Sequence, residues 1–317
     1  MRTQETKLEA RPEVETRPRP AAPVRARRTN KQAWIPYVFL VPFAVPFVLF
    51  LILPLLYALY TSLFQEQLVG GTVFSGTDNY VEALGDRAFR SGMGRMVLFG
   101  VVQIPVMIGL ALAFALILDG GVGRIRRFFR LAAFLPYAVP TVVAALLWGY
   151  LYGPSFGPFA QIAESAGVAA PRFLSDSWML WSLANIVTWE YTGYNMIILY
   201  AALQAVTPDL KEAAAVDGAS AWKIARYIKI PLIAPALILT VVFSIIGTLQ
   251  LFNEPRIMEA ISPTVIQTDY TPNLYAYNLA FTNQEYNYAA AISFVLGAVV
   301  FVGSYTFMIF TNRSAVR

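Results

Sequence analysis

Residues 207–233 of this chain read TPDLKEAAAVDGASAWKIARYIKIPLI, a stretch that begins with the local signals of a short helix. Thr207 can cap the helix, Pro208 suits its first position, and Glu212 suits the positive N-terminal end. Gly218 is then expected to stop it. We therefore expect a first helix between Thr207 and Gly218.

The second half of the same stretch predicts another short helix. Ser220 can cap it, the following residues carry both apolar and basic side chains, and Pro231 is expected to end it. This charged pair of helices connects two apolar runs and so lies outside the membrane. The face that carries its small residues therefore has no lipid to pack against. We infer that the pair docks onto something cytoplasmic.

The chain as a whole has the composition of a membrane protein. Of its 317 residues, 57% are hydrophobic and only 14% are charged, whereas roughly a quarter is charged in ordinary soluble domains. A bilayer core about 30 Å thick needs roughly 20 apolar residues in a helix. Six runs meet this length: 34–63, 97–118, 131–152, 178–206, 234–252 and 288–311.

The basic residues indicate which loops lie inside. With the N-terminus in the cytoplasm, 19 of the 24 Lys and Arg residues fall in inside segments and five fall outside. Because they cluster beside apolar runs, they orient helices, and nucleic-acid binding is not expected. The sequence predicts a membrane protein with both termini in the cytoplasm.

Three regions follow from this division. Residues 1–33 are rich in Arg, Pro and Glu, and we expect a disordered basic arm, either a solubilising tail or a binder of anionic lipid headgroups. Residues 34–312 form the membrane domain, and residues 313–317 form a cytoplasmic tail. The arm has too few large apolar side chains to offset the entropy of ordering it.

Most active-site chemistry is excluded by composition. The chain has no Cys and no His, so thiolate, Ser-His-Asp and His-based metal chemistry are ruled out. None of its five lysines follows a glycine, so it has no phosphate-binding P-loop. We expect no catalytic residue, no metal and no cofactor in this chain, and any ATP must bind to another chain.

The fourth apolar run carries the polar cluster WEYTGYN at residues 189–195. Helical spacing places Glu190 beside Tyr194 and Tyr191 beside Asn195. An acid at the centre of a membrane helix costs roughly 2.5–3.5 kcal/mol on insertion scales. Two interpretations remain open: Glu190 makes an interhelical bond, or it forms the wall of a polar solute pathway.

The fifth run ends in further polar residues. Ser244 and Thr248 share a face, whereas Gln250 points roughly opposite Thr248 in a regular helix. These side chains, with Asn253 beyond them, can therefore line one cavity only where the helix is irregular. Packing between helices is the competing explanation for the first two.

The 207–233 stretch resembles a known family. Glu212-Ala213-Ala214, then Gly218, Ile228 and Ile230-Pro231 at their spacings, match the EAA loop of binding-protein-dependent ABC importer permeases, with Ile230 where Leu is usual. The motifs DNY at 78–80, LPY at 135–137 and QLFNE at 250–254 are similar to the carbohydrate branch of the family, of the maltose or glycerol-phosphate first-permease type.

The resemblance implies a fold and a set of partners. The fold would be an all-α membrane protein with six transmembrane helices, the type I ABC importer permease fold, and a cytoplasmic coupling helix between helices 4 and 5. The partners would be a second homologous permease, two cytoplasmic ABC ATPases that bind ATP and Mg, and an extracytoplasmic sugar-binding protein. Transport would proceed by alternating access.

The resemblance also implies two groups of site residues. Contact with the ATPase would fall to Glu212, Ala213, Ala214, Asp217, Gly218, Ile228 and Pro231. The solute pathway would be lined by Glu190, Tyr194, Asn195, Thr248, Gln250 and Asn253. The outer loop 255–285 would face the sugar-binding protein, although its aromatic residues also suit the membrane surface.

Other functions stay open at this level. The solute is expected to be a di- or oligosaccharide, because helices two to six have no Lys or Arg in their apolar cores to meet a phosphate. Glycerol phosphate or a polyol is the alternative. An ion-coupled secondary transporter would rely on Glu190, and a lipid-linked glycosyl transferase would need an acid pair that the sequence does not show.

Overall fold

The computed structural model describes residues 35–67, 69–120 and 124–315. It divides into two compact units, residues 1–53 and 54–317. The described part of the first unit is helix α1 (Ile35–Phe47) and the π-helical turn η2 (Val48–Ile52). The predicted disordered arm lies outside the described residues.

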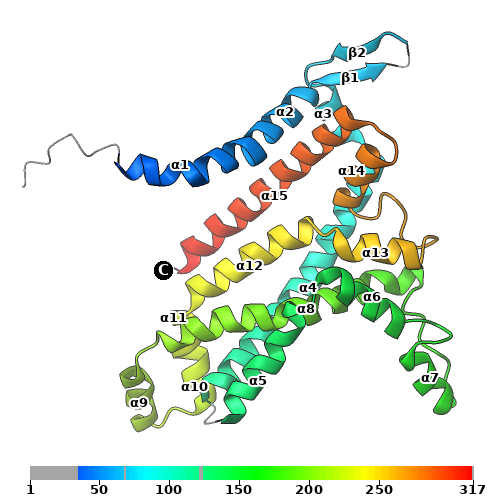
Figure 1. The fold of residues 1–317 in the computed structure, drawn as a ribbon. Helices are drawn as coiled ribbons and strands as arrows, with labels where there is room; N and C mark the ends of the chain where they lie inside the picture. Colours follow the sequence, from blue (N-terminus) through cyan, green and yellow to red (C-terminus); the bar gives the residue numbers. More distant parts are fainter. Residues whose placement is uncertain (1–34, 68, 121–123, 316–317) are drawn as a thin grey trace, which may run out of the picture. The chain divides into compact units, whose positions relative to one another are not determined.

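The remaining elements are helical except for one hairpin (Figure 1). In chain order they are α2 (Leu53–Thr61), β1 (Phe64–Gln67), β2 (Gly71–Phe74), α3 (Asp78–Gly85), α4 (Arg87–Gly120), α5 (Arg124–Phe134), η3 (Leu135–Ala138), α6 (Thr141–Leu151), α7 (Pro158–Ser165), α8 (Asp176–Gln204), α9 (Pro208–Val216), α10 (Ala221–Ile224), η4 (Ala225–Lys229), α11 (Ile230–Leu232), α12 (Ala234–Leu249), α13 (Asn253–Ile261), α14 (Pro272–Phe281) and α15 (Tyr286–Ala315).

Among the described residues, four helices are long and apolar enough to cross a membrane: Tyr37–Thr61, Arg87–Gly120, Ala234–Ile261 and Tyr286–Thr311. A fifth crossing results if the pair Arg126–Ala138 and Thr141–Leu151, bent by 95°, is one broken span. These match five of the six predicted runs. The fold is therefore that of a multi-pass helical membrane protein.

The third predicted run, 131–152, is not a continuous helix, and that expectation is wrong. Helix α5 gives way to the 3-10 turn η3, and α6 starts afresh at Thr141. Pro136 and Pro140 have no N–H to donate and disfavour helical backbone in the residue before them. The chain therefore bends sharply between α5 and α6.

The fourth predicted run forms α8, a continuous helix that is not apolar enough to count among the candidate spans. It packs along α4 and also contacts α5, α6 and α12. At Gly193 an added Cβ would overlap the backbone carbonyl of Ala133 on α5, so only glycine permits this close approach. A helix covered by protein on several sides can carry polar residues such as Glu190 and Asn195.

The segment after the first span differs from the prediction. A β-hairpin, with Phe64 paired to Phe74, and the short helix α3 come before α4, which begins ten residues before the predicted start of the second run at 97. Asn79 fixes α3 by donating from Nδ2 to the carbonyls of Ser62 and Phe64, both at 2.8 Å. Glycines at positive φ, Gly70 and Gly71, make the hairpin turn possible.

Asp86 joins this region to the C-terminal helices. Its Oδ1 accepts from the backbone N–H of Ala88 and Phe89 and so caps α4, while its Oδ2 accepts from the hydroxyls of Tyr275 at 2.7 Å and Tyr288 at 2.9 Å. Burial acts to raise the pKa of Asp86, but these hydrogen bonds outweigh it and hold the pKa below its ordinary value.

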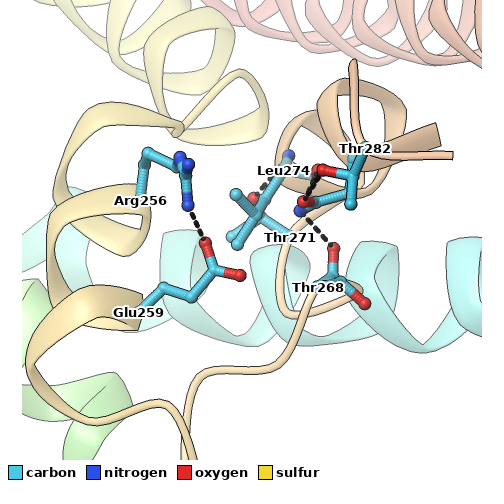
Figure 2. Close-up of polar contacts among 7 residues, drawn as sticks. Arg256, Glu259, Thr268, Thr271, Leu274 and Thr282 are labelled. Carbon is cyan, nitrogen blue, oxygen red and sulfur yellow. Dashed lines mark hydrogen bonds and ion pairs between the residues drawn. The ribbon is translucent and has the colours of Figure 1, made fainter. Parts of the chain in front are cut away.

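The predicted outer loop 255–285 is largely helical, because α13 and α14 occupy most of it (Figure 2). Thr271 caps α14 by accepting from the Leu274 N–H at 3.2 Å, and Arg256 forms an ion pair with Glu259 at 2.6 Å. Asn278 donates to the Thr268 carbonyl at 3.4 Å. The last helix, α15, continues past the predicted end of the final span at 311.

Candidate functional site

The fifth predicted span is broken where its polar residues lie. Helix α12 ends at Leu249 and α13 starts at Asn253, with Phe252 at φ −139° and ψ −52° between them. The break is closed by turns, in which the Gln250 N–H donates to the Ile246 carbonyl and the Leu251 N–H donates to the Thr248 carbonyl, each at 3.2 Å. This is the irregularity that a shared cavity requires.

A cavity of about 220 Å³ lies against this break. Helices α4, α8 and α12 and the start of α13 all contribute to its wall. It contains five of the six residues predicted for the solute pathway: Tyr194, Asn195, Thr248, Gln250 and Asn253. Because the chain turns between Thr248 and Asn253, their side chains meet in one place despite their helical spacing.

The sixth predicted residue, Glu190, does not line this cavity. It borders a second one of about 320 Å³, together with Tyr191 and residues 137–141 of the bend between α5 and α6. Tyr191 borders both cavities, so the two lie side by side along α8. The bend between α5 and α6 thus provides a wall that the sequence did not predict.

Glu190 has an acidic neighbour, which the sequence analysis did not place beside it. Glu254, at the start of α13, adjoins its carboxyl group, and only 2% of Glu190 and 3% of Glu254 are exposed. Neither carboxyl oxygen of Glu190 has a hydrogen-bond donor among the described residues. Buried acceptors without a donor are costly, so this site is suited to a donor from outside the described chain.

Helix α4 contributes two cavity residues that the sequence analysis missed, Gln103 and Met107. The Gln103 amide lies 3.3 Å from the Met107 sulfur and 3.5 Å from the Thr188 hydroxyl, while its Oε1 has no partner among the described residues. The available signal was an amide side chain in the otherwise apolar run 97–118. Gln103 lines the cavity, but its Oε1 is itself buried.

The polar groups of the cavity are held in place by their own helices. Asn195 donates from Nδ2 to the Tyr191 carbonyl at 3.0 Å, one turn earlier on α8. The Ser244 hydroxyl donates to the Thr240 carbonyl at 2.8 Å on α12. Together with the tyrosine ring of Tyr194, the cavity presents aromatic surface, amides and hydroxyls. Within the described residues, no group of three acidic side chains could hold a metal ion.

The 207–233 stretch forms two short helices, α9 and α10, with the turn at Gly218. Gly218 has φ +79°, a backbone conformation that disfavours other residues. The Ala219 N–H donates to the Ala214 carbonyl at 2.9 Å and closes the end of α9. Of the seven predicted contact residues, Ala214 and Ile228 are half-buried, and the others are exposed: Glu212, Ala213, Asp217, Gly218 and Pro231.

The second limb of this loop, residues 220–233, differs from the prediction in one respect. Ser220 caps α10 by accepting from the Lys223 N–H at 3.4 Å, as expected, but Pro231 does not end the helical path. The π-helical turn η4 precedes it, and α11 continues to Leu232. Pro231 has no backbone N–H, so it cannot make the hydrogen bond of a regular α-helix to the residue four positions earlier. The wider π-helical turn before it changes the hydrogen-bond pattern at this point and so accommodates the proline.

Comparison with known proteins agrees with this arrangement. Residues 106–314 match the family described as binding-protein-dependent transport system inner membrane component. The match covers α8, the 207–233 loop and the broken helix α12–α13, which together carry both groups of predicted site residues. The chain belongs to this family, the permeases of binding-protein-dependent ABC transporters.

Individual relatives extend over nearly the whole chain. The lactose transport system permease protein LacF of Rhizobium radiobacter is 32% identical, covering 85% of this chain and 91% of its own length. The sn-glycerol-3-phosphate transport system permease protein UgpA of Agrobacterium fabrum is 29% identical, covering 84% and 90%. The fold is similar to a chain of a bacterial alginate ABC transporter, solved in complex with an alginate pentasaccharide-bound periplasmic protein, with a TM-score of 0.77, 22% identity and coverage of 89% and 94%.

Proposed function

We propose that this chain is the permease subunit of an ATP-driven importer that passes a neutral sugar, a di- or oligosaccharide, into the cytoplasm. The observation that carries the substrate class is the cavity beside the α12–α13 break. Its described lining offers tyrosine rings, amides and hydroxyls and no Lys or Arg. A sugar has apolar ring faces and hydroxyl edges that match this set, whereas a phosphate is normally held by basic side chains.

The topology that we propose has six crossings. The four long apolar helices and the bent α5–α6 pair supply five, and α8 supplies the sixth as a helix covered by protein. The basic residues place the 207–233 loop and both termini in the cytoplasm. The membrane is the bacterial inner membrane, in keeping with the family description.

The partners that we propose are a second homologous permease, two cytoplasmic ATPases and an extracytoplasmic sugar-binding protein. The 207–233 loop would dock into an ATPase through the seven residues predicted for that contact. Its surface supports this role, because Val216 on α9 is 88% exposed and Trp222 on α10 is 70% exposed, and exposed large apolar side chains are typical of docking surfaces. ATP and Mg would be bound by the ATPases, and this chain itself makes or breaks no covalent bond.

Transport follows from moving the helices around the cavity. Binding of ATP would draw the ATPases together and move the loop, opening the cavity toward the loaded binding protein, and hydrolysis would return it to the inward-facing state. If this movement exposes the buried acceptors of Gln103 and Glu190, sugar hydroxyls would donate to them and make up for the missing donors.

The test is purification of the chain from its native membrane in mild detergent, followed by reconstitution of whatever accompanies it. A second permease and a P-loop ATPase are expected to co-purify, and liposomes containing them are expected to take up neutral di- or oligosaccharides with ATP. An ATPase variant that lacks the P-loop lysine serves as the control. Uptake of sn-glycerol 3-phosphate in preference to every neutral sugar would refute the substrate class.

A second outcome would refute the proposal that ATP drives transport. A chain that arrives alone and transports solute until an uncoupler is added would be an ion-coupled carrier. Measuring uptake with ATP and with an imposed proton gradient separates the two energy sources in the same vesicles.

A further inference from the structure

Asp119 lies at the cytoplasmic end of α4 and accepts hydrogen bonds from three side chains. The Lys229 ammonium is 2.6 Å from its Oδ2 and the Lys211 ammonium is 3.3 Å from the same atom. Gln204 donates from Nε2 to its Oδ1 at 2.8 Å. Only 3% of the Asp119 side chain is exposed, which makes this a buried carboxylate with two cationic partners.

These partners come from three different elements. Lys211 belongs to α9, the first limb of the 207–233 loop, and Lys229 ends η4 in the second limb. Gln204 is the last residue of α8. One carboxylate on α4 therefore holds both limbs of the loop and the end of the helix that leads into it.

This bond supplies a connection that the covalent chain lacks. The loop runs directly from α8 and into α12, whereas 86 residues separate the end of α4 at Gly120 from the start of the loop at Thr207. No residue of α9, all of which is described, is buried, so Lys211 is important for holding that limb. In the second limb, Ile233 belongs to one apolar cluster with Ala111, Ala115 and Leu118 of α4.

Helix α4 carries the connection to the cavity. It is continuous from Arg87 to Gly120 and contributes Met107 and Gln103 to the cavity wall. Met107 precedes Asp119 by twelve residues, a span of roughly 18 Å along a helix at 1.5 Å per residue. A displacement of Asp119 is therefore transmitted along a single helix to the solute.

We propose that Asp119 is the positioning residue that ties both limbs of the 207–233 loop to α4, so that movement of the loop shifts the α4 wall of the cavity. This rests on the proposed function, in which an ATPase moves the loop. Without the carboxylate, the two lysines face each other as like charges, and only the apolar contact of Ile233 is left to connect the loop to α4, which weakens the coupling between them.

The first experiment uses the complete complex in liposomes and measures solute transported per ATP hydrolysed. Asp119→Asn is expected to lower this ratio at least fivefold while ATP hydrolysis continues. The exchange Asp119→Lys with Lys229→Asp restores one ion pair and is expected to recover at least half of the ratio. Glu164→Gln, which removes an exposed acid on α7, is the matched control. An unchanged ratio in Asp119→Asn, or no recovery in the exchange variant, overturns the proposal.

The second experiment separates movement of the loop from movement of α4. The chain has no cysteine, so Val216→Cys reports on the loop and Met107→Cys reports on the cavity wall. ATP is expected to change thiol labelling at both positions when Asp119 is present, and at the loop alone in the Asp119→Asn background. Response at both positions in that background overturns the role of Asp119. An unresponsive loop in the parent chain refutes the proposed function instead.

Discussion

Tyr137 and Tyr194 stack with their ring centroids 4.7 Å apart and their planes 23° apart. Tyr137 comes from the bend between α5 and α6, and Tyr194 comes from α8 and lines the cavity. An aromatic pair of this kind contributes roughly 0.5–1.5 kcal/mol beyond the area it buries. The bend therefore fixes the orientation of the ring that a sugar would meet.

Replacement of Tyr194 tests this arrangement. Tyr194→Ala removes the aromatic wall and is expected to raise the KM for uptake about tenfold, equivalent to roughly 1.4 kcal/mol of binding. Tyr194→Phe keeps the stack and loses only the hydroxyl, so the change is expected to stay below threefold. Tyr150→Ala, at an exposed tyrosine of α6, is the control. Equal KM values for Tyr194→Ala and the parent would remove this ring from the pathway.

Replacement of Glu190 tests whether its carboxyl group faces the solute or couples transport to an ion. Glu190→Gln keeps the shape and removes a negative charge, whose insertion at mid-membrane costs roughly 2.5–3.5 kcal/mol. We expect a melting temperature in detergent no lower than that of the parent, and ATP-driven uptake within threefold of it. Glu259→Gln breaks the ion pair with Arg256 and is the control for loss of a paired acid. Uptake that is driven by an imposed proton gradient in the parent and lost in Glu190→Gln would instead assign Glu190 to ion coupling.

Gly218 tests the docking role of the loop. Its positive φ makes any side chain strained by roughly 1–2 kcal/mol, although an added Cβ would meet nothing within 4 Å. Gly218→Trp is expected to leave the chain in the membrane and to reduce the co-purified ATPase severalfold, because the ring projects into the docking surface. Gly218→Ala measures the strain alone, and Gly109→Ala, also in open space but at ordinary helical φ, is the control. Normal ATPase recovery with Gly218→Trp would contradict the assignment.

Asp86 predicts a dependence of stability on pH. Its pKa in the folded chain lies below the ordinary 3.8, so its contribution is present above pH 3.8 and is lost as the pH falls through the folded pKa. Asp86→Asn is therefore expected to lower the melting temperature at pH 7, since hydrogen bonds to a charged group are about 1 kcal/mol stronger than those to a neutral one. The difference from the parent should shrink below pH 4. A difference independent of pH would mean that the charge has no part in it.

Local sequence signals predicted much of this fold. Ser220 and Gly218 have the roles expected of them in the loop, and four of the six apolar runs correspond to candidate spans, with a fifth if the bent pair α5–α6 is one span. The sharp bend in the third run was not predicted, because the length of the apolar run alone does not reveal it. Pro136 and Pro140 were the signals in the sequence that indicated it. The hairpin before α3 was missed although Gly70 and Gly71 stand at its turn.

The candidate site shows where a sequence alone falls short. Helical spacing showed that Thr248 and Gln250 could line one cavity only if the helix were irregular near Gln250. The sequence did not show that the helix is broken there. The pairing of Glu190 with Glu254, and of Asp119 with Lys229, joins residues far apart in the chain. Such contacts depend on how whole helices pack, and no local pattern encodes them.

The break between α12 and α13 is held from outside the cavity. Thr271 donates to the Leu251 carbonyl at 3.1 Å, and Asn273 donates to the Gln250 carbonyl at 2.8 Å, both from the start of α14. Neither of these two residues lines the described cavity. Helix α14 therefore acts as a brace: it helps set the shape of a cavity to which it contributes no side chain, so the cavity can be reshaped by substitutions that leave every lining residue unchanged.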